Sequence, residues 1–133
     1  MRLAKPRGVH ATCVEDLQVF QRARAFAVAV FAITDRFQAD FWLRDQLTRS
    51  AASIASNIAE GFPQSTDRAF ARYLSVAAGS AEEARAHLAV AGERARAAPT
   101  AVRDLRQEAL EIVRMLNALI RHLHRSDRKE RDV

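Results

Sequence analysis

The sequence predicts an all-α protein, an up-down-up-down antiparallel four-helix bundle. Its 133 residues include only four glycines and three prolines, and the helix-favouring residues alanine, leucine and arginine dominate. Apolar residues recur at helical spacing in four long segments, and no stretch shows the alternation with period two that is typical of a strand. The segments between them are short, which makes successive helices antiparallel neighbours.

The first two helices are expected over residues 16–37 and 40–60. The apolar stripe expected to form the core side of the first helix is Leu17, Phe20, Ala23, Ala27, Val30 or Phe31, and Ile33 or Thr34. The stripe of the second helix is Leu43, Leu47, Ala51, Ile54 and Ile58. Gly61 is a natural residue just beyond a helix end, and Pro63 forbids continuation of the helix.

The third and fourth helices have clear start signals. Ser65 or Thr66 can cap the third helix, Asp67 lies in its first turn, and the helix should end near residue 96. Pro99 and Thr100 open the fourth helix. Its apolar stripe is Val102, Leu105, Ala109, Ile112 or Val113, Leu116, Leu119 or Ile120, and Leu123.

Charge is distributed unevenly along the chain, which carries a net charge of +5 from 21 basic and 16 acidic residues. We divide it into a basic N-terminal arm (1–14), whose order the sequence leaves open, the bundle (15–124) and a charged C-terminal tail (125–133). Basic ends can contact nucleic acid or an acidic partner, or they can be solvated tails. The candidate nucleic-acid contacts are Arg2, Lys5, Arg7, Arg121, Arg125, Arg128 and Lys129.

Several functional classes are disfavoured by the sequence. Cys13 is the single cysteine, so no intrachain disulfide can form, and we expect an inert thiol. The first residues lack the apolar core of a signal peptide, and the longest apolar run (25–33) is short for a membrane span, so we expect a cytoplasmic protein without a membrane partner. No HExxH, CxxC, P-loop or paired Glu-x-x-His motif occurs, so we expect no catalytic residue, metal or cofactor.

The second helix carries a polar stripe beside its apolar one. The stripe consists of Gln46, Ser50, Ser53, Asn57 and Glu60. Glu60 lies in the last turn, where the helix dipole disfavours a carboxylate by about 0.3–1 kcal/mol. An arginine is therefore expected as its partner, and the nearest are Arg49, Arg68 and Arg72.

The third helix has a matching anomaly at Gly79 and Ser80. Glycine inside a helix costs about 1 kcal/mol relative to alanine, but it lets another backbone approach closely. We expect the two polar stripes to meet, within a subunit or between subunits, as a seam that fixes helix register or as a site for a ligand or partner. The candidate residues of this seam or interface are Gln46, Arg49, Ser53, Asn57, Glu60, Arg72, Gly79, Ser80 and Glu83.

Residues 41–62 resemble the signature of a bacterial family. The run Asn57-Ile58-Ala59-Glu60-Gly61 matches its pattern, as do the preceding Phe41, Gln46, Arg49 and Ser53-Ile54. The third helix continues the resemblance with Phe70-x-x-Tyr73-Leu74 and Ala78-Gly79-Ser80-x-x-Glu83. The family is the four-helix-bundle proteins called 23S rRNA intervening-sequence proteins, and the resemblance covers about residues 15–92.

The resemblance implies a ring of bundles, a homopentamer, with no enzymatic activity and an undefined role. A similar bundle is the accessory protein of diversity-generating retroelements, a basic pentamer that associates with reverse transcriptase and nucleic acid. Two hypotheses follow. The chain is a self-assembling structural or adaptor protein with a protein partner, or it is a sequence-nonspecific module that binds RNA or DNA through its basic ends.

Overall fold

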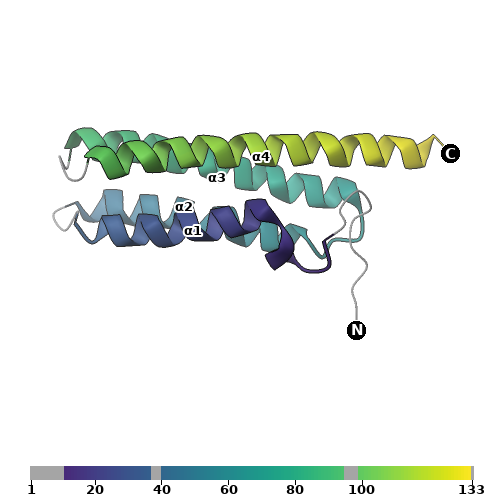
Figure 1. Ribbon diagram of the computed structural model, residues 1–133, viewed down its shortest axis with the longest axis horizontal. Coiled ribbons are helices and arrows are strands. Elements are labelled where there is room, and N and C mark those ends of the chain that lie inside the picture. The colour runs from purple at the N-terminus through teal and green to yellow at the C-terminus, as the bar shows by residue number, and fades with distance from the viewer. Residues whose placement is uncertain (1–10, 37–39, 95–98, 133) are drawn as a thin grey trace.

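The computed structural model describes residues 11–36, 40–94 and 99–132, and within these ranges every regular element is helical. A short 3-10 helix, η1 (Val14–Asp16), leads into α1 (Gln18–Thr34), which is followed by α2 (Phe41–Gly61), α3 (Asp67–Arg94) and α4 (Pro99–Arg131). Figure 1 shows α1 and α2 as one layer and α3 and α4 as a second layer, with the end of α4 reaching past its neighbours. The predicted all-α fold with four helices is confirmed.

Each helix packs beside its neighbours in the chain, and α1 also packs on α4, which closes the bundle. The contacts between α2 and α3 show their antiparallel direction. Gly61 at the end of α2 lies against Tyr73 near the start of α3. Ser53, earlier in α2, is hydrogen-bonded to Ser80, later in α3. Gly61 and Ser53 thus meet α3 in the reverse of their order along α2.

The core lies where the apolar stripes of the four helices meet. In α2 the buried apolar residues are the predicted stripe, Leu43, Leu47, Ala51, Ile54 and Ile58. The buried stripe of α3 is rich in alanine, and small side chains let helices pack closely. Phe62 and Phe70 meet edge to face with ring centroids 6.0 Å apart and close the α2–α3 end of the bundle.

The expected core face of α1 is confirmed only in part. Ala23, Val30 and Ile33 are buried as predicted, whereas Phe20 is only partly buried and Phe31 is exposed, and Val19 and Phe26 are buried without having been predicted. The reason lies in the composition of residues 25–33, which are all apolar, so the periodicity cannot mark one face. Consequently α1 is apolar both toward the core and on its outer side.

The helix ends follow most of the sequence signals. Thr66 caps α3, because its Oγ1 accepts a hydrogen bond of 3.1 Å from the backbone N–H of Ala69. α1 starts later than expected because Val14–Asp16 form the 3-10 turn η1. Phe37 and the expected end of the third helix at residue 96 lie outside the described residues. α4 continues to Arg131, so residues 125–131, expected as a tail, extend the helix.

Gly61 serves close packing rather than a helix cap. It is the last residue of α2, not the first residue beyond it, and its φ is not in the left-handed region. A Cβ at Gly61 would lie 2.6 Å from the Cβ of Tyr73, closer than any real contact. The glycine therefore allows α2 and α3 to approach each other at this end.

Candidate association surfaces

The polar stripes of α2 and α3 meet within one subunit. The hydroxyls of Ser53 and Ser80 are hydrogen-bonded at 2.8 Å. Asn57 Nδ2 donates to the backbone carbonyl of Ser53 at 2.8 Å and to its Oγ at 2.9 Å. These three side chains form a partly buried cluster that ties the two helices together in one register.

The other predicted seam residues do not join this cluster. Gln46 is partly buried, while Arg49, Glu60 and Arg72 are exposed. Among the described residues, no ion pair joins Glu60 to any of the three arginines proposed for it. Glu83 lies 3.5 Å from His87, one turn further along α3. The inner part of the seam is therefore structural, and its outer part is open surface.

An exposed line of residues runs along α3 on the outer side of this seam. Its members recur every three or four positions, and we call them the α3 ridge: Val76, Gly79, Glu83, Ala86 and Val90. A Cβ built on Gly79 would meet nothing within 4 Å. The ridge thus combines two exposed valines with a bare stretch of backbone, which gives another helix room to approach.

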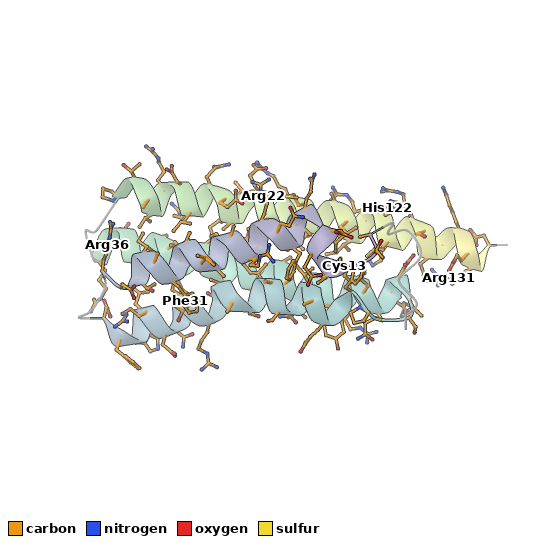
Figure 2. All side chains as sticks on the ribbon, turned by 60° about the horizontal axis from the view of Figure 1, so that its bottom comes forward. Cys13, Arg22, Phe31, Arg36, His122 and Arg131 are labelled. Atoms are coloured by element: carbon orange, nitrogen blue, oxygen red, sulfur yellow. The ribbon has the colours of Figure 1, made fainter. Side chains whose placement is uncertain are left out.

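A hollow of about 570 Å³ lies on the outer surface between α1 and α2. We call it the α1/α2 groove; it is lined by Phe20, Arg24, Ala27, Val28, Phe31, Ala52, Ala55, Ser56 and Ala59. Arg24 lies over the ring of Phe20, with Cζ 5.6 Å from the ring centroid. Figure 2 shows Phe31 on the side of α1 that faces α2, and Arg22 on the side toward α4.

The large exposed apolar side chains all lie on α1, α2 and α3. Phe41 is 77% exposed, Val28 67%, Trp42 63%, Val76 52%, Phe31 50% and Val90 48%. The ring of Trp42 meets the ring of His87 on α3 edge to face, with centroids 5.9 Å apart. In the described parts of α4 no side chain of this kind is exposed. The exposed apolar side chains are therefore spread over α1, α2 and α3, and α4 differs from these three helices.

The solvent-facing side of α4 is a basic stripe. Its exposed arginines share one face of the helix over about 37 Å: Arg103, Arg106, Arg114, Arg121, Arg125 and Arg128. Arg114 pairs with Glu111 at 2.6 Å, and Arg103 lies 3.5 Å from Asp104, so these carboxylates flank the stripe. The other four arginines have no ion-pair partner in the described ranges.

The sequence predicted only part of this basic stripe. It named Arg121, Arg125, Arg128 and Lys129, and the structure places these four on the exposed C-terminal half of α4. It missed the three arginines nearer the start of the helix, although their helical spacing was a usable signal. Arg2, Lys5 and Arg7 lie outside the described residues, so their proposed role stays a prediction.

One carboxyl group is buried without a hydrogen bond. Asp67, in the first turn of α3, is 4% exposed, and neither carboxylate oxygen has a hydrogen-bond partner in the described structure. Burial is the main cause that raises the pKa of Asp67; Ser126 and His122 on α4 oppose this effect, and the negative charges of Glu130 and Asp127 on the same helix add to it. The favourable helix dipole at this position does not outweigh the loss of solvent.

The structure describes one free thiol, that of Cys13. Cys13 is exposed, and hydrogen bonding to Asp16 is the main cause that raises the pKa of its thiol. A raised pKa lowers the thiolate population, so this thiol is a poor nucleophile. In the described ranges no three His, Cys, Asp or Glu side chains are placed to hold a metal ion, and no helix is long and apolar enough to cross a membrane.

Comparison with known proteins finds a matching family model and a solved structure with a similar fold. A family model described as 23S rRNA-intervening sequence protein matches residues 15–118. Among solved structures, a crystal structure from Bacteroides thetaiotaomicron, described as a protein with unknown function from the S23 ribosomal protein family, superposes with a TM-score of 0.71. It is 23% identical in sequence, and the match covers 77% of this chain and 97% of that chain, which shows a shared fold. No curated protein matches the chain.

Proposed function

The chain belongs to the 23S rRNA-intervening sequence protein family, and from this premise we propose that it is a non-enzymatic, self-assembling bundle, a structural or adaptor ring of the cytoplasm. The single observation that carries the proposal is the two-sided apolar character of α1. Phe26 and Val30 fill the core, yet Val28 and Phe31 remain 67% and 50% exposed on the outer side. A helix that is apolar all round is normally buried all round.

The amount of exposed apolar surface supports the same proposal. Single exposed apolar residues are ordinary, but a contiguous apolar patch marks an interaction site. Here Phe20, Val28 and Phe31 line one hollow with three alanines of α2, and Phe41 borders a second hollow at the Phe31 end. Copies of the chain are the partner that is always present, and the family resemblance sets the expected number at five.

A paired substitution tests this self-assembly. Val28→Ser with Phe31→Ser replaces exposed side chains only, so the subunit should fold as before. Sedimentation velocity over a dilution series should show that the apparent dissociation constant rises at least tenfold, because the apolar contact area is lost. Ala118→Ser, on the exposed side of α4, is the matched control and should leave association unchanged. Equal association of all three proteins would contradict the proposal.

The basic stripe of α4 favours a second candidate function, the binding of RNA or DNA without sequence specificity. Arg106, Arg121, Arg125 and Arg128 are exposed and have no carboxylate partner in the described structure. A row of cations along one helix face matches the repeating charge of a phosphate backbone. A ring would repeat the row in every subunit and strengthen binding by avidity.

A salt series tests the nucleic-acid proposal. Binding to generic duplex DNA and structured RNA is measured for the full chain, a chain lacking residues 1–14, and a variant with Arg121, Arg125 and Arg128 changed to Gln. A slope of about −0.9 in log affinity against log salt is expected per phosphate contact on B-DNA. The triple variant should lose about three contacts, and loss of slope in the truncated chain would place contacts on the N-terminal arm.

The matched control for this series removes the same number of positive charges from a different surface. Changing Arg49, Arg68 and Arg72 to Gln removes three exposed cations from α2 and α3. This control should keep the wild-type slope. No binding at low salt, or an equal loss of slope in both triple variants, would contradict a site on α4.

A further inference from the structure

Gly79 is the one described glycine that the subunit itself does not explain. At Gly61 a Cβ would strike Tyr73 at 2.6 Å, and at Gly92 it would lie 3.1 Å from Val102 Cγ1. At Gly79 a Cβ would meet nothing within 4 Å. Glycine inside a helix costs about 1 kcal/mol relative to alanine, and no packing contact within the subunit requires glycine at this position. A close approach by something outside the subunit supplies that reason.

The α3 ridge has the pattern of a helix that enters a groove. Val76 and Gly79 lie on one side of Glu83, and Ala86 and Val90 lie on the other, so apolar positions flank a central carboxylate. Such spacing, with anchors every three or four residues, is typical of helix-in-groove binding. Glu83 has one neighbour of opposite charge in the described structure, His87 at 3.5 Å, and this contact is ionic only when the histidine is protonated.

The α1/α2 groove has the complementary pattern. It is apolar along its length, and Arg24 is the one charged side chain among its lining residues. The guanidinium of Arg24 rests on the ring of Phe20 and has no carboxylate partner within the described residues. The groove spans about 17 Å from Phe20 to Phe31, and the ridge about 21 Å from Val76 to Val90, so the two surfaces match in length.

We propose that the α3 ridge of one copy docks into the α1/α2 groove of the next copy, with Glu83 paired to Arg24. This inference rests on the self-assembly proposed above and deepens it, because it names the two contact surfaces. A cation in one apolar surface and a carboxylate in the other fix the register of docking and exclude other partners. The bare backbone at Gly79 lets the ridge approach Ala52, Ala55 and Ala59, the alanines of α2 that line the groove.

The positions of the two surfaces determine the kind of assembly. The groove lies between α1 and α2, and the ridge lies on α3 beside α2, so they occupy adjoining sides of the bundle. Contact between two different surfaces is head to tail, and each added copy leaves one groove and one ridge free. Because the surfaces are not on opposite sides, successive copies turn, which favours closure into a ring over a straight fibre.

Charge reversal tests this docking. Arg24→Glu and Glu83→Arg each place like charges across the contact, and each should lower the mass in multi-angle light scattering to that of the 14.8 kDa chain. The double variant Arg24→Glu/Glu83→Arg should regain the wild-type mass. Arg106→Glu, an equal charge change on α4, is the control and should assemble normally.

A mixture of the two single variants tests the head-to-tail arrangement. In the mixture, the reversed groove of Arg24→Glu meets the reversed ridge of Glu83→Arg, and the unaltered groove of Glu83→Arg meets the unaltered ridge of Arg24→Glu. Both contacts then join opposite charges, so the mixture should form assemblies in which the two variants alternate, with a mass of about 30 kDa or more. Single variants that assemble normally, a double variant that stays monomeric, or a mixture whose mass stays at that of one chain would each overturn the docking. A wild-type chain that is itself monomeric would instead overturn the self-assembly on which the docking rests.

Discussion

Substitution of alanine for glycine should give opposite results at two positions in this bundle. Gly79 is exposed in the middle of α3, and a Cβ there would meet nothing within 4 Å. Gly79→Ala should therefore gain the difference in helix propensity, about 1 kcal/mol in the free energy of unfolding. For a domain of this size the gain corresponds to a rise of about 3–5 °C in Tm.

Gly61→Ala is the comparison for this prediction. Its Cβ would lie 2.6 Å from Tyr73 Cβ and 2.9 Å from Phe70 Cδ1. The Cβ of Tyr73 cannot move without its backbone, so α2 and α3 must separate. This overpacking should cost about 1–3 kcal/mol and lower Tm, against the smaller gain in helix propensity.

The assay is thermal unfolding by circular dichroism at two protein concentrations, one below and one above the dissociation constant of self-association. In dilute protein, Gly79→Ala should melt above wild type and Gly61→Ala below it. At the higher concentration the gain of Gly79→Ala should shrink, because the added methyl group lies in the proposed contact between copies. A lower Tm for Gly79→Ala in dilute protein would refute the reasoning, since it would mean that the position is packed within the subunit.

Three further substitutions test the interior and the seam. Asp67→Asn should raise the urea midpoint of unfolding at pH 7, because burial raises the pKa of Asp67 and the ionised carboxylate destabilises the fold. Below the ordinary pKa of 3.8 the carboxyl group is protonated in both the folded and the unfolded chain, so the gain in stability should vanish there. A gain in stability that does not change with pH would contradict the raised pKa of Asp67. Asn57→Leu removes two hydrogen bonds to Ser53 and should cost about 1 kcal/mol in chemical unfolding, whereas unchanged assembly and melting would show that the seam is dispensable. Glu108→Gln weakens the bidentate contact with Arg22 and should cost up to about 1 kcal/mol at low salt; a loss that persists in high salt would mean that charge is not the cause.

The sequence predicted the helices because their signals are local. Thr66 can accept the N–H of Ala69 in any chain with this spacing, and Pro63 stops a helix whatever surrounds it. The apolar stripes of α2, α3 and α4 stand against polar neighbours, so their periodicity identifies the buried face. The match of the family model over residues 15–118 extends the resemblance into α4, where no motif was noted.

The missed features depend on neighbours that are distant in sequence. Phe31 and Val30 are adjacent apolar residues, and only the packing of α2 and α4 against α1 decides that Val30 is buried and Phe31 exposed. Gly61 has the pattern of a helix cap, but its role comes from Tyr73 on the next helix. Asp67 has the pattern of an ordinary first-turn carboxylate until the end of α4 covers it.

Among the candidate site residues the sequence identified the cluster but not its surroundings. Ser53, Asn57 and Ser80 were named from their spacing, and the structure joins them by hydrogen bonds. The outer groove was not found, because alanines and valines on a helix are ordinarily taken as core. Glu60 has none of its expected arginine partners in the described structure. An unfavourable carboxylate in the last turn of α2 therefore did not indicate a compensating ion pair within the subunit.

The molar mass of the full chain in solution tests the central claim of self-assembly most directly. Light scattering coupled to size-exclusion chromatography, at micromolar protein and physiological salt, should give a mass several times the 14.8 kDa of one chain, and the pentamer implied by the family resemblance corresponds to about 74 kDa. A mass of 14.8 kDa at every concentration up to the limit of solubility would contradict the account, because the exposed faces of α1, α2 and α3 would then remain uncovered by other copies.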